Sequence, residues 1–116
     1  VVIKNQEPDG IITRAQDYIR QNFRKDISLE EVARAVGISP YYFSKLFKEE
    51  AGMNFTEYLT GIRIETAKRL LSERELSIKQ VCVDSGYANP NYFSRIFKKW
   101  VGITPTEFRD GVGEDH

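Results

Sequence analysis

Residues 54–74, NFTEYLTGIRIETAKRLLSER, decide how this chain is organised. Their apolar side chains recur at the spacing of an amphipathic helix, at Phe55, Tyr58, Leu59, Ile62, Ala67, Leu70 and Leu71. Asn54 stands just before this stripe and Glu57 follows three residues later, an arrangement close to a capping box. At 1.5 Å per residue, about 19 helical residues would span roughly 28 Å. The stretch therefore predicts a long helix that links the segments on its two sides.

The segments on either side of this helix are two copies of one pattern. Residues 28–37 correspond to residues 77–86, and residues 40–58 correspond to residues 90–108. Each copy has capping-box spacing, a short apolar-periodic stretch, a glycine, and a second helical stretch that opens with proline. This order predicts a duplicated helix-turn-helix motif. The identical pairs in the longer stretch are Pro40/Pro90, Tyr42/Tyr92, Phe43/Phe93, Ser44/Ser94, Phe47/Phe97, Lys48/Lys98, Gly52/Gly102, Thr56/Thr106 and Glu57/Glu107.

The second helix of each motif is predicted to have an apolar face and a polar face. The residues expected to face the core are Phe43, Leu46 and Phe47 in the first copy and Phe93, Ile96 and Phe97 in the second. The residues expected to face solvent are Tyr41, Ser44, Lys45 and Lys48 in the first copy and Asn91, Ser94, Arg95 and Lys98 in the second. Amide, hydroxyl and cationic groups of these kinds bind base edges and phosphates in the major groove.

Four further aromatic or small residues are assigned to packing. Tyr42 and Tyr92 are expected to pack within their motifs rather than to read bases. Cys82 aligns with Ala33 and is predicted to be a small core residue. Trp100 aligns with Glu50 and is expected to close the second core, with a contact to a partner as the alternative.

The charge of the chain is unevenly distributed. The formal net charge is zero, which by itself does not favour a nucleic-acid partner. Residues 77–109, however, contain five basic and two acidic side chains, and the C-terminal residues 110–116 contain three acidic ones. The second motif is therefore positive, and the charge distribution is compatible with a polyanionic partner.

The chain lacks the residues that membrane, metal-binding and catalytic functions need. No apolar run approaches the roughly 18 residues of a membrane helix, so we expect no membrane association and a cytoplasmic location. Cys82 is the only cysteine and His116 the only histidine, so we predict neither a metal site nor a cofactor. The adjacent pairs Glu30-Glu31 and Glu49-Glu50 do not face each other on a helix, which makes them poor acid–base dyads. The sequence predicts no catalytic residues and no enzyme.

Three stretches of the chain resemble a known family. They are ISLEEVARAVGISPYYFSKLFKEEAG (27–52), RIETAKRLL (63–71) and VCVDSGYANPNYFSRIFKKWVGITPTEFR (81–109). Over residues 9–110 the chain resembles the C-terminal DNA-binding domain of the AraC/XylS transcription regulators. The first motif and the linking helix resemble the response-regulator members of this family in particular. The signature positions are Gly86, Tyr92, Phe93, Phe97, Lys98, Gly102, Pro105 and Arg109.

The resemblance implies an all-α fold of seven helices, in which a long linker helix joins two helix-turn-helix subdomains. It implies transcription regulation through sequence-specific binding of double-stranded DNA by two recognition helices in adjacent major-groove segments, close to RNA polymerase. The positions that it implies for base contacts are Tyr41, Ser44, Lys45, Asn91, Ser94 and Arg95. The positions that it implies for phosphate contacts are Ser39, Lys48, Asn89 and Lys98.

Two departures from the family's usual charge affect the expected affinity. The first recognition helix has no net charge, and the domain as a whole lacks a strongly basic balance. We therefore expect modest affinity for DNA from this domain alone, with dimerisation through a further N-terminal domain adding to it.

The expected organisation has five parts. Residues 1–8 are predicted to be a linker, 9–53 the first subdomain, 54–75 the linker helix, 76–110 the second subdomain and 111–116 a disordered acidic tail. The main alternative function is a helical protein–protein interaction or dimerisation module that does not read DNA. A second alternative, an accessory domain of an enzyme, finds no candidate site residues in the sequence.

Overall fold

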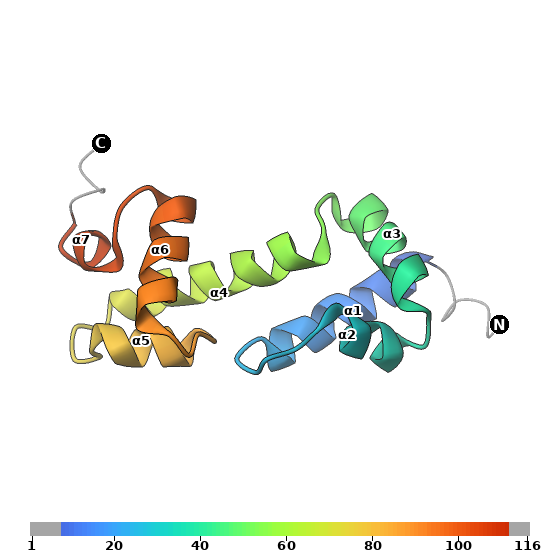
Figure 1. Ribbon diagram of the computed structural model, residues 1–116, viewed down its shortest axis with the longest axis horizontal. Coiled ribbons are helices and arrows are strands. Elements are labelled where there is room, and N and C mark those ends of the chain that lie inside the picture. Colours follow the sequence, from blue (N-terminus) through green and yellow to red (C-terminus); the bar gives the residue numbers. More distant parts are fainter. Residues whose placement is uncertain (1–7, 112–116) are drawn as a thin grey trace. The chain divides into compact units, whose positions relative to one another are not determined.

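The computed structural model describes residues 8–111, which form seven α-helices (Figure 1). These helices are α1 (Pro8–Asn22), α2 (Leu29–Val36), α3 (Pro40–Ala51), α4 (Phe55–Leu71), α5 (Ile78–Asp84), α6 (Pro90–Val101) and α7 (Pro105–Arg109). The predicted all-α fold is confirmed. No helix within residues 8–111 has both the length and the apolar character that a membrane span requires.

The chain divides into two compact units, Val1–Gly61 and Ile62–His116. Unit 1 contains α1, α2, α3 and the first turns of α4, and unit 2 contains the remainder of α4 with α5, α6 and α7. The boundary falls inside α4, so this helix contributes one end to each core.

The helix ends differ slightly from those predicted. Helix α1 begins at Pro8, because proline fits the first turn of a helix, where its missing N–H would have no partner. The rest of the predicted linker, residues 1–7, and residues 112–116 of the predicted tail lie outside the described residues. Helix α4 ends at Leu71, before the end of the linker helix predicted at residues 54–75. There the Ser72 hydroxyl donates a hydrogen bond to the Arg69 carbonyl at 2.7 Å and so satisfies a group of the last turn.

In unit 1, helices α1, α2 and α3 pack against one another (Figure 1). Aliphatic and aromatic side chains form the core of this unit. At its centre the Phe47 ring lies 5.5 Å from the ring of Phe43 and 5.4 Å from that of Tyr58, measured between centroids. The buried members of this core are Ile11, Ile12, Ala15, Ile19, Phe23, Ile27, Val32, Ala33, Val36, Phe43, Leu46, Phe47, Phe55 and Leu59.

Unit 2 repeats this arrangement with different residues. Its Phe97 ring lies 5.8 Å from Phe93 and 5.6 Å from Phe108, which is the counterpart of Tyr58. The buried members of its core are Ile64, Ala67, Leu71, Val81, Cys82, Tyr87, Phe93 and Phe97. Cys82 is buried as predicted, and its thiol donates to the Tyr87 carbonyl at 3.3 Å. Ile64 is a core residue that the single predicted stripe along α4 did not include.

Side chains cap the helices where the sequence predicted. The Asn54 side-chain oxygen accepts from the Glu57 N–H at 2.8 Å, and the Glu57 carboxylate accepts from the Asn54 N–H at 3.0 Å. Thr104 and Glu107 form the same reciprocal pair at the start of α7, and its hydrogen bonds lower the pKa of the Glu107 carboxyl. Ser28 and Ser77 accept from the N–H groups of the third residue of α2 and α5, respectively.

The hydroxyl of Tyr58 is buried and has no hydrogen-bond partner among the described residues. Burial also raises the pKa of this hydroxyl, so it stays protonated. An unpaired buried polar group costs about 1–3 kcal/mol, and unit 2 has phenylalanine at the equivalent position, Phe108. We therefore expect Tyr58→Phe to raise the free energy of unfolding by about 1 kcal/mol, measured by urea denaturation.

Tyr18→Phe is the matched control, because the Tyr18 hydroxyl donates a hydrogen bond to the Glu31 carboxylate. Removing it should lower the stability of unit 1. If Tyr58→Phe lowers stability as well, the Tyr58 hydroxyl has a partner in solution.

Candidate nucleic-acid interface

In each unit a glycine turn sets the direction of the second helix of the motif. Gly37 has a left-handed backbone (φ 82°), which lets the Ile38 N–H donate to the Ala33 carbonyl at 3.1 Å. In unit 2, Gly86 (φ 104°) is followed by the equivalent bond from the Tyr87 N–H to the Cys82 carbonyl at 3.0 Å. The predicted duplication is therefore present at the level of individual backbone hydrogen bonds.

Ser39 and Asn89 cap the two second helices, α3 and α6. The Ser39 hydroxyl accepts from the Tyr42 N–H at 3.2 Å, and the Asn89 side-chain oxygen accepts from the Tyr92 N–H at 3.0 Å. Each side chain keeps a donor, the hydroxyl hydrogen of Ser39 and the amide group of Asn89. Both residues are exposed, so these donors can reach a phosphate.

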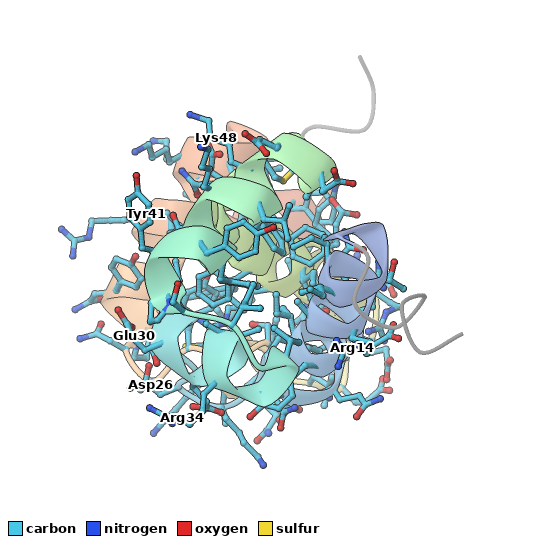
Figure 2. The ribbon with its side chains drawn as sticks, turned by 90° about the vertical axis from the view of Figure 1, so that its right-hand side faces the viewer. Arg14, Asp26, Glu30, Arg34, Tyr41 and Lys48 are labelled. Atoms are coloured by element: carbon cyan, nitrogen blue, oxygen red, sulfur yellow. The ribbon has the colours of Figure 1, made fainter. Side chains whose placement is uncertain are left out.

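The two faces of α3 lie as predicted. Phe43, Leu46 and Phe47 are buried in the core of unit 1. The remaining predicted contact residues, Tyr41, Ser44, Lys45 and Lys48, are all exposed. Figure 2 shows Tyr41 and Lys48 directed away from the ribbon on the outer side of α3.

Helix α6 presents a similar face with one difference. Asn91, Arg95 and Lys98 are exposed, but Ser94 is half-buried, so its hydroxyl is less accessible than that of Ser44. On the inner side Phe93 and Phe97 are fully buried, whereas Ile96 is half-buried.

The cationic groups on these faces are available for a ligand. Within residues 8–111, the side chains of Lys45, Lys48, Arg95 and Lys98 form no ion pair. Their environments differ, because α3 also exposes Glu49 and Glu50 whereas the counterparts on α6 are Lys99 and Trp100. The face of unit 2 is therefore the more positive one.

Three aromatic residues are more exposed than the sequence predicted. Trp100 does not close the second core: it is 44% exposed at the end of α6. Its counterpart Glu50 is also exposed, and this equivalence was the signal that could have placed it. Tyr42 and Tyr92 are 45% and 49% exposed, so their packing is partial, although the Tyr92 ring lies 5.9 Å from that of Tyr87.

Arg109 has a structural role that the sequence analysis did not assign. Its guanidinium donates from Nε to the Leu71 carbonyl at 2.9 Å and from Nη2 to the Glu73 carbonyl at 3.2 Å. These bonds satisfy carbonyl groups at and just beyond the end of α4 and hold α7 in place.

The described residues offer little to catalysis or metal binding. Residues 8–111 contain no cluster of three or more histidine, cysteine or acidic side chains that could hold a metal ion. Burial raises the pKa of the Cys82 thiol, which makes it a poor nucleophile. Burial also raises the pKa of Tyr87 to about 12, so its hydroxyl stays neutral within the core. His116 lies outside the described residues.

The chain is similar in sequence and fold to known helix-turn-helix proteins. The family described as "Helix-turn-helix domain" matches residues 32–111. The C-terminal domain of AraT, a response regulator from Geobacillus stearothermophilus, is 40% identical, with a TM-score of 0.83 over 86% of this chain and 84% of that one. A transcriptional regulator from Chromobacterium violaceum, described among AraC-type DNA-binding domain-containing proteins, is 26% identical, with a TM-score of 0.80 over 91% of this chain and 95% of that one.

Curated relatives are longer than this chain. The regulatory protein PocR of Salmonella typhimurium is 36% identical over 80 residues, which make up 69% of this chain and 26% of that protein. The chain thus spans about a quarter of the length of this relative. The two glycine turns, the two exposed helix faces and these similarities lead to one conclusion: the chain belongs to the AraC-type helix-turn-helix family of DNA-binding domains.

Proposed function

We propose that this domain binds double-stranded DNA sequence-specifically and thereby regulates transcription. The observation that supports this most directly is the duplicated exposed face, with cationic side chains on both α3 and α6 that form no ion pair among the described residues. The family to which the chain belongs, and relatives named as regulators, favour the same function. In this proposal the two second helices are recognition helices, each in a major-groove segment of the same DNA.

The residues divide into two groups by their chemistry. Base edges are contacted by Tyr41, Ser44, Lys45, Asn91, Ser94 and Arg95. Phosphates are contacted by Ser39, Lys48, Asn89 and Lys98. Asn91 can bond adenine and Arg95 can bond guanine, each through two hydrogen bonds. Because Ser94 is half-buried, we expect the smallest contribution to base reading from it.

Selection of bound sites from random DNA tests this function. The expected result is enrichment of one sequence with two preferred elements, which lie in successive major-groove segments. If no sequence is enriched and the chain instead self-associates with rising concentration, the interaction-module alternative is correct.

We further infer that the whole protein strengthens binding through a second copy and acts on RNA polymerase. The acidic side chains of unit 1 weaken the affinity of this domain for DNA. A dimer of the longer protein should therefore bind a paired site more tightly. A comparison of the isolated chain with the longer protein on the selected site measures this gain.

Glu30 offers a gain-of-affinity prediction. In a helix-turn-helix motif the first helix crosses the DNA backbone, and Glu30 lies in the first turn of α2. Figure 2 places Glu30 on the same outward side as Tyr41, and the equivalent residue of unit 2 is the exposed Lys79. We expect Glu30→Lys to tighten DNA binding and to steepen its salt dependence by about one unit, measured by titrations at several salt concentrations.

Asp17→Lys is the matched control, because it makes the same charge change on α1, outside the motif. It should tighten binding far less. Equal gains from both variants would mean that only the net charge matters and that α2 does not lie against the backbone.

A further inference from the structure

Tyr41 is the most exposed large apolar or aromatic side chain in the described part of the chain, at 83%. It is the second residue of α3, and the equivalent position of α6 is Asn91. Among the described residues its ring makes no aromatic contact and its hydroxyl no hydrogen bond. An aromatic ring held this far out of the core is accessible to a ligand over most of its surface.

The position of Tyr41 limits what that ligand group can be. In helix-turn-helix proteins the N-terminal residues of the recognition helix meet base edges in the major groove. Base edges there are hydrogen-bonding groups, with one apolar exception, the C5-methyl group of thymine. A ring at this place therefore has one apolar partner on the DNA.

We propose that Tyr41 recognises a thymine through contact of its ring with the C5-methyl group. This inference rests on the proposed DNA binding and adds the identity of one base read by unit 1. Unit 1 then reads a T·A pair by apolar contact, whereas unit 2, with Asn91 and Arg95 on its exposed face, reads by hydrogen bonds.

The hydroxyl of Tyr41 allows a second kind of contact, a hydrogen bond to a phosphate, and the experiment must distinguish the two. A phenol at this place can donate to a phosphate, as the cap residue Ser39 and Lys48 of α3 can. That contact would be indifferent to base identity. Tyr41→Phe keeps the ring and removes the hydroxyl, and Tyr41→Ala removes both.

The experiment uses the 116-residue chain and a site obtained by selection from random DNA. Each thymine of the site is replaced singly by deoxyuridine, which keeps the base pair and removes only the methyl group. For the unmodified chain we expect the Kd to rise about fourfold at one thymine, the effect of losing one buried methyl-sized group. Tyr41→Phe should keep this ratio, and Tyr41→Ala should reduce it to about one. Met53→Ala, at an exposed side chain outside the proposed DNA contacts, should leave it unchanged.

Failure of the inference and failure of the proposed function give different results. If Tyr41→Ala keeps the thymine-to-uracil ratio at every position, or Tyr41→Phe abolishes it, the methyl contact is wrong while DNA binding stands. If the unmodified chain binds no selected site, the proposed function itself is wrong. A thermal melt of each variant confirms folding, which the high exposure of Tyr41 should leave unchanged.

Discussion

Phe97→Ala is expected to lower the free energy of unfolding by about 3–5 kcal/mol. Phe97 is fully buried, and its ring lies against those of Phe93 and Phe108. Alanine would leave a cavity that the helices around it can close only in part. Small domains have total stabilities of about 5–15 kcal/mol, so the loss is a large share of the whole.

Phe47→Ala should have an effect of the same size in unit 1. Phe47 is also fully buried, between Phe43, Phe55 and Tyr58. Urea denaturation of both variants measures the two losses. Because each ring belongs to a different core, hydrogen exchange should show the larger loss of protection in the unit that carries the substitution.

Trp100→Ala is the matched control for Phe97→Ala. Both residues are aromatic and lie on α6, but Trp100 is 44% exposed. Its removal should cost much less than that of Phe97, because a partly solvated side chain leaves no closed cavity. Equal losses from the two variants would mean that Trp100 is buried in solution and that the face assigned to α6 is wrong.

The sequence predicted what depends on local spacing. The caps at Ser28, Asn54 and Ser77 follow from side chains that bond the backbone N–H group three residues further on. The buried and exposed faces of α3 follow from the helical period. The two copies support each other, because each predicts the same buried and exposed faces for its second helix.

The misplaced residues depend on the arrangement of whole helices. Ile64 was missed because one apolar stripe was assumed along α4, whereas this helix contributes to two cores. Trp100 was expected to close the second core, but it lies near the end of α6, where 44% of it is exposed. The bonds from Arg109 to the carbonyl groups of Leu71 and Glu73 join residues far apart in sequence, and no spacing rule predicts such a pair.

Arg95→Ala is expected to weaken binding to the selected site by about 1–3 kcal/mol and to relax the preference at one base pair. Arg95 is exposed on α6 and forms no ion pair within residues 8–111, so its guanidinium is free to bond guanine through two hydrogen bonds. Losing this contact removes discrimination, so binding to other sequences should change little.

Lys98→Ala should behave differently, because Lys98 lies about one turn further along α6, where phosphates rather than bases are in reach. We expect weaker binding to all sequences and a salt dependence shallower by about one unit. Titrations on the best site and on single-base variants, at several salt concentrations, separate the two roles.

The matched pair in unit 1, Lys45→Ala and Lys48→Ala, should show smaller losses, because Glu49 and Glu50 offset the positive charge of α3. Equal losses of affinity from Arg95→Ala and Lys98→Ala on all sequences would mean that Arg95 does not contact a base. A phosphate contact is the only role in which an arginine and a lysine on this face become equivalent.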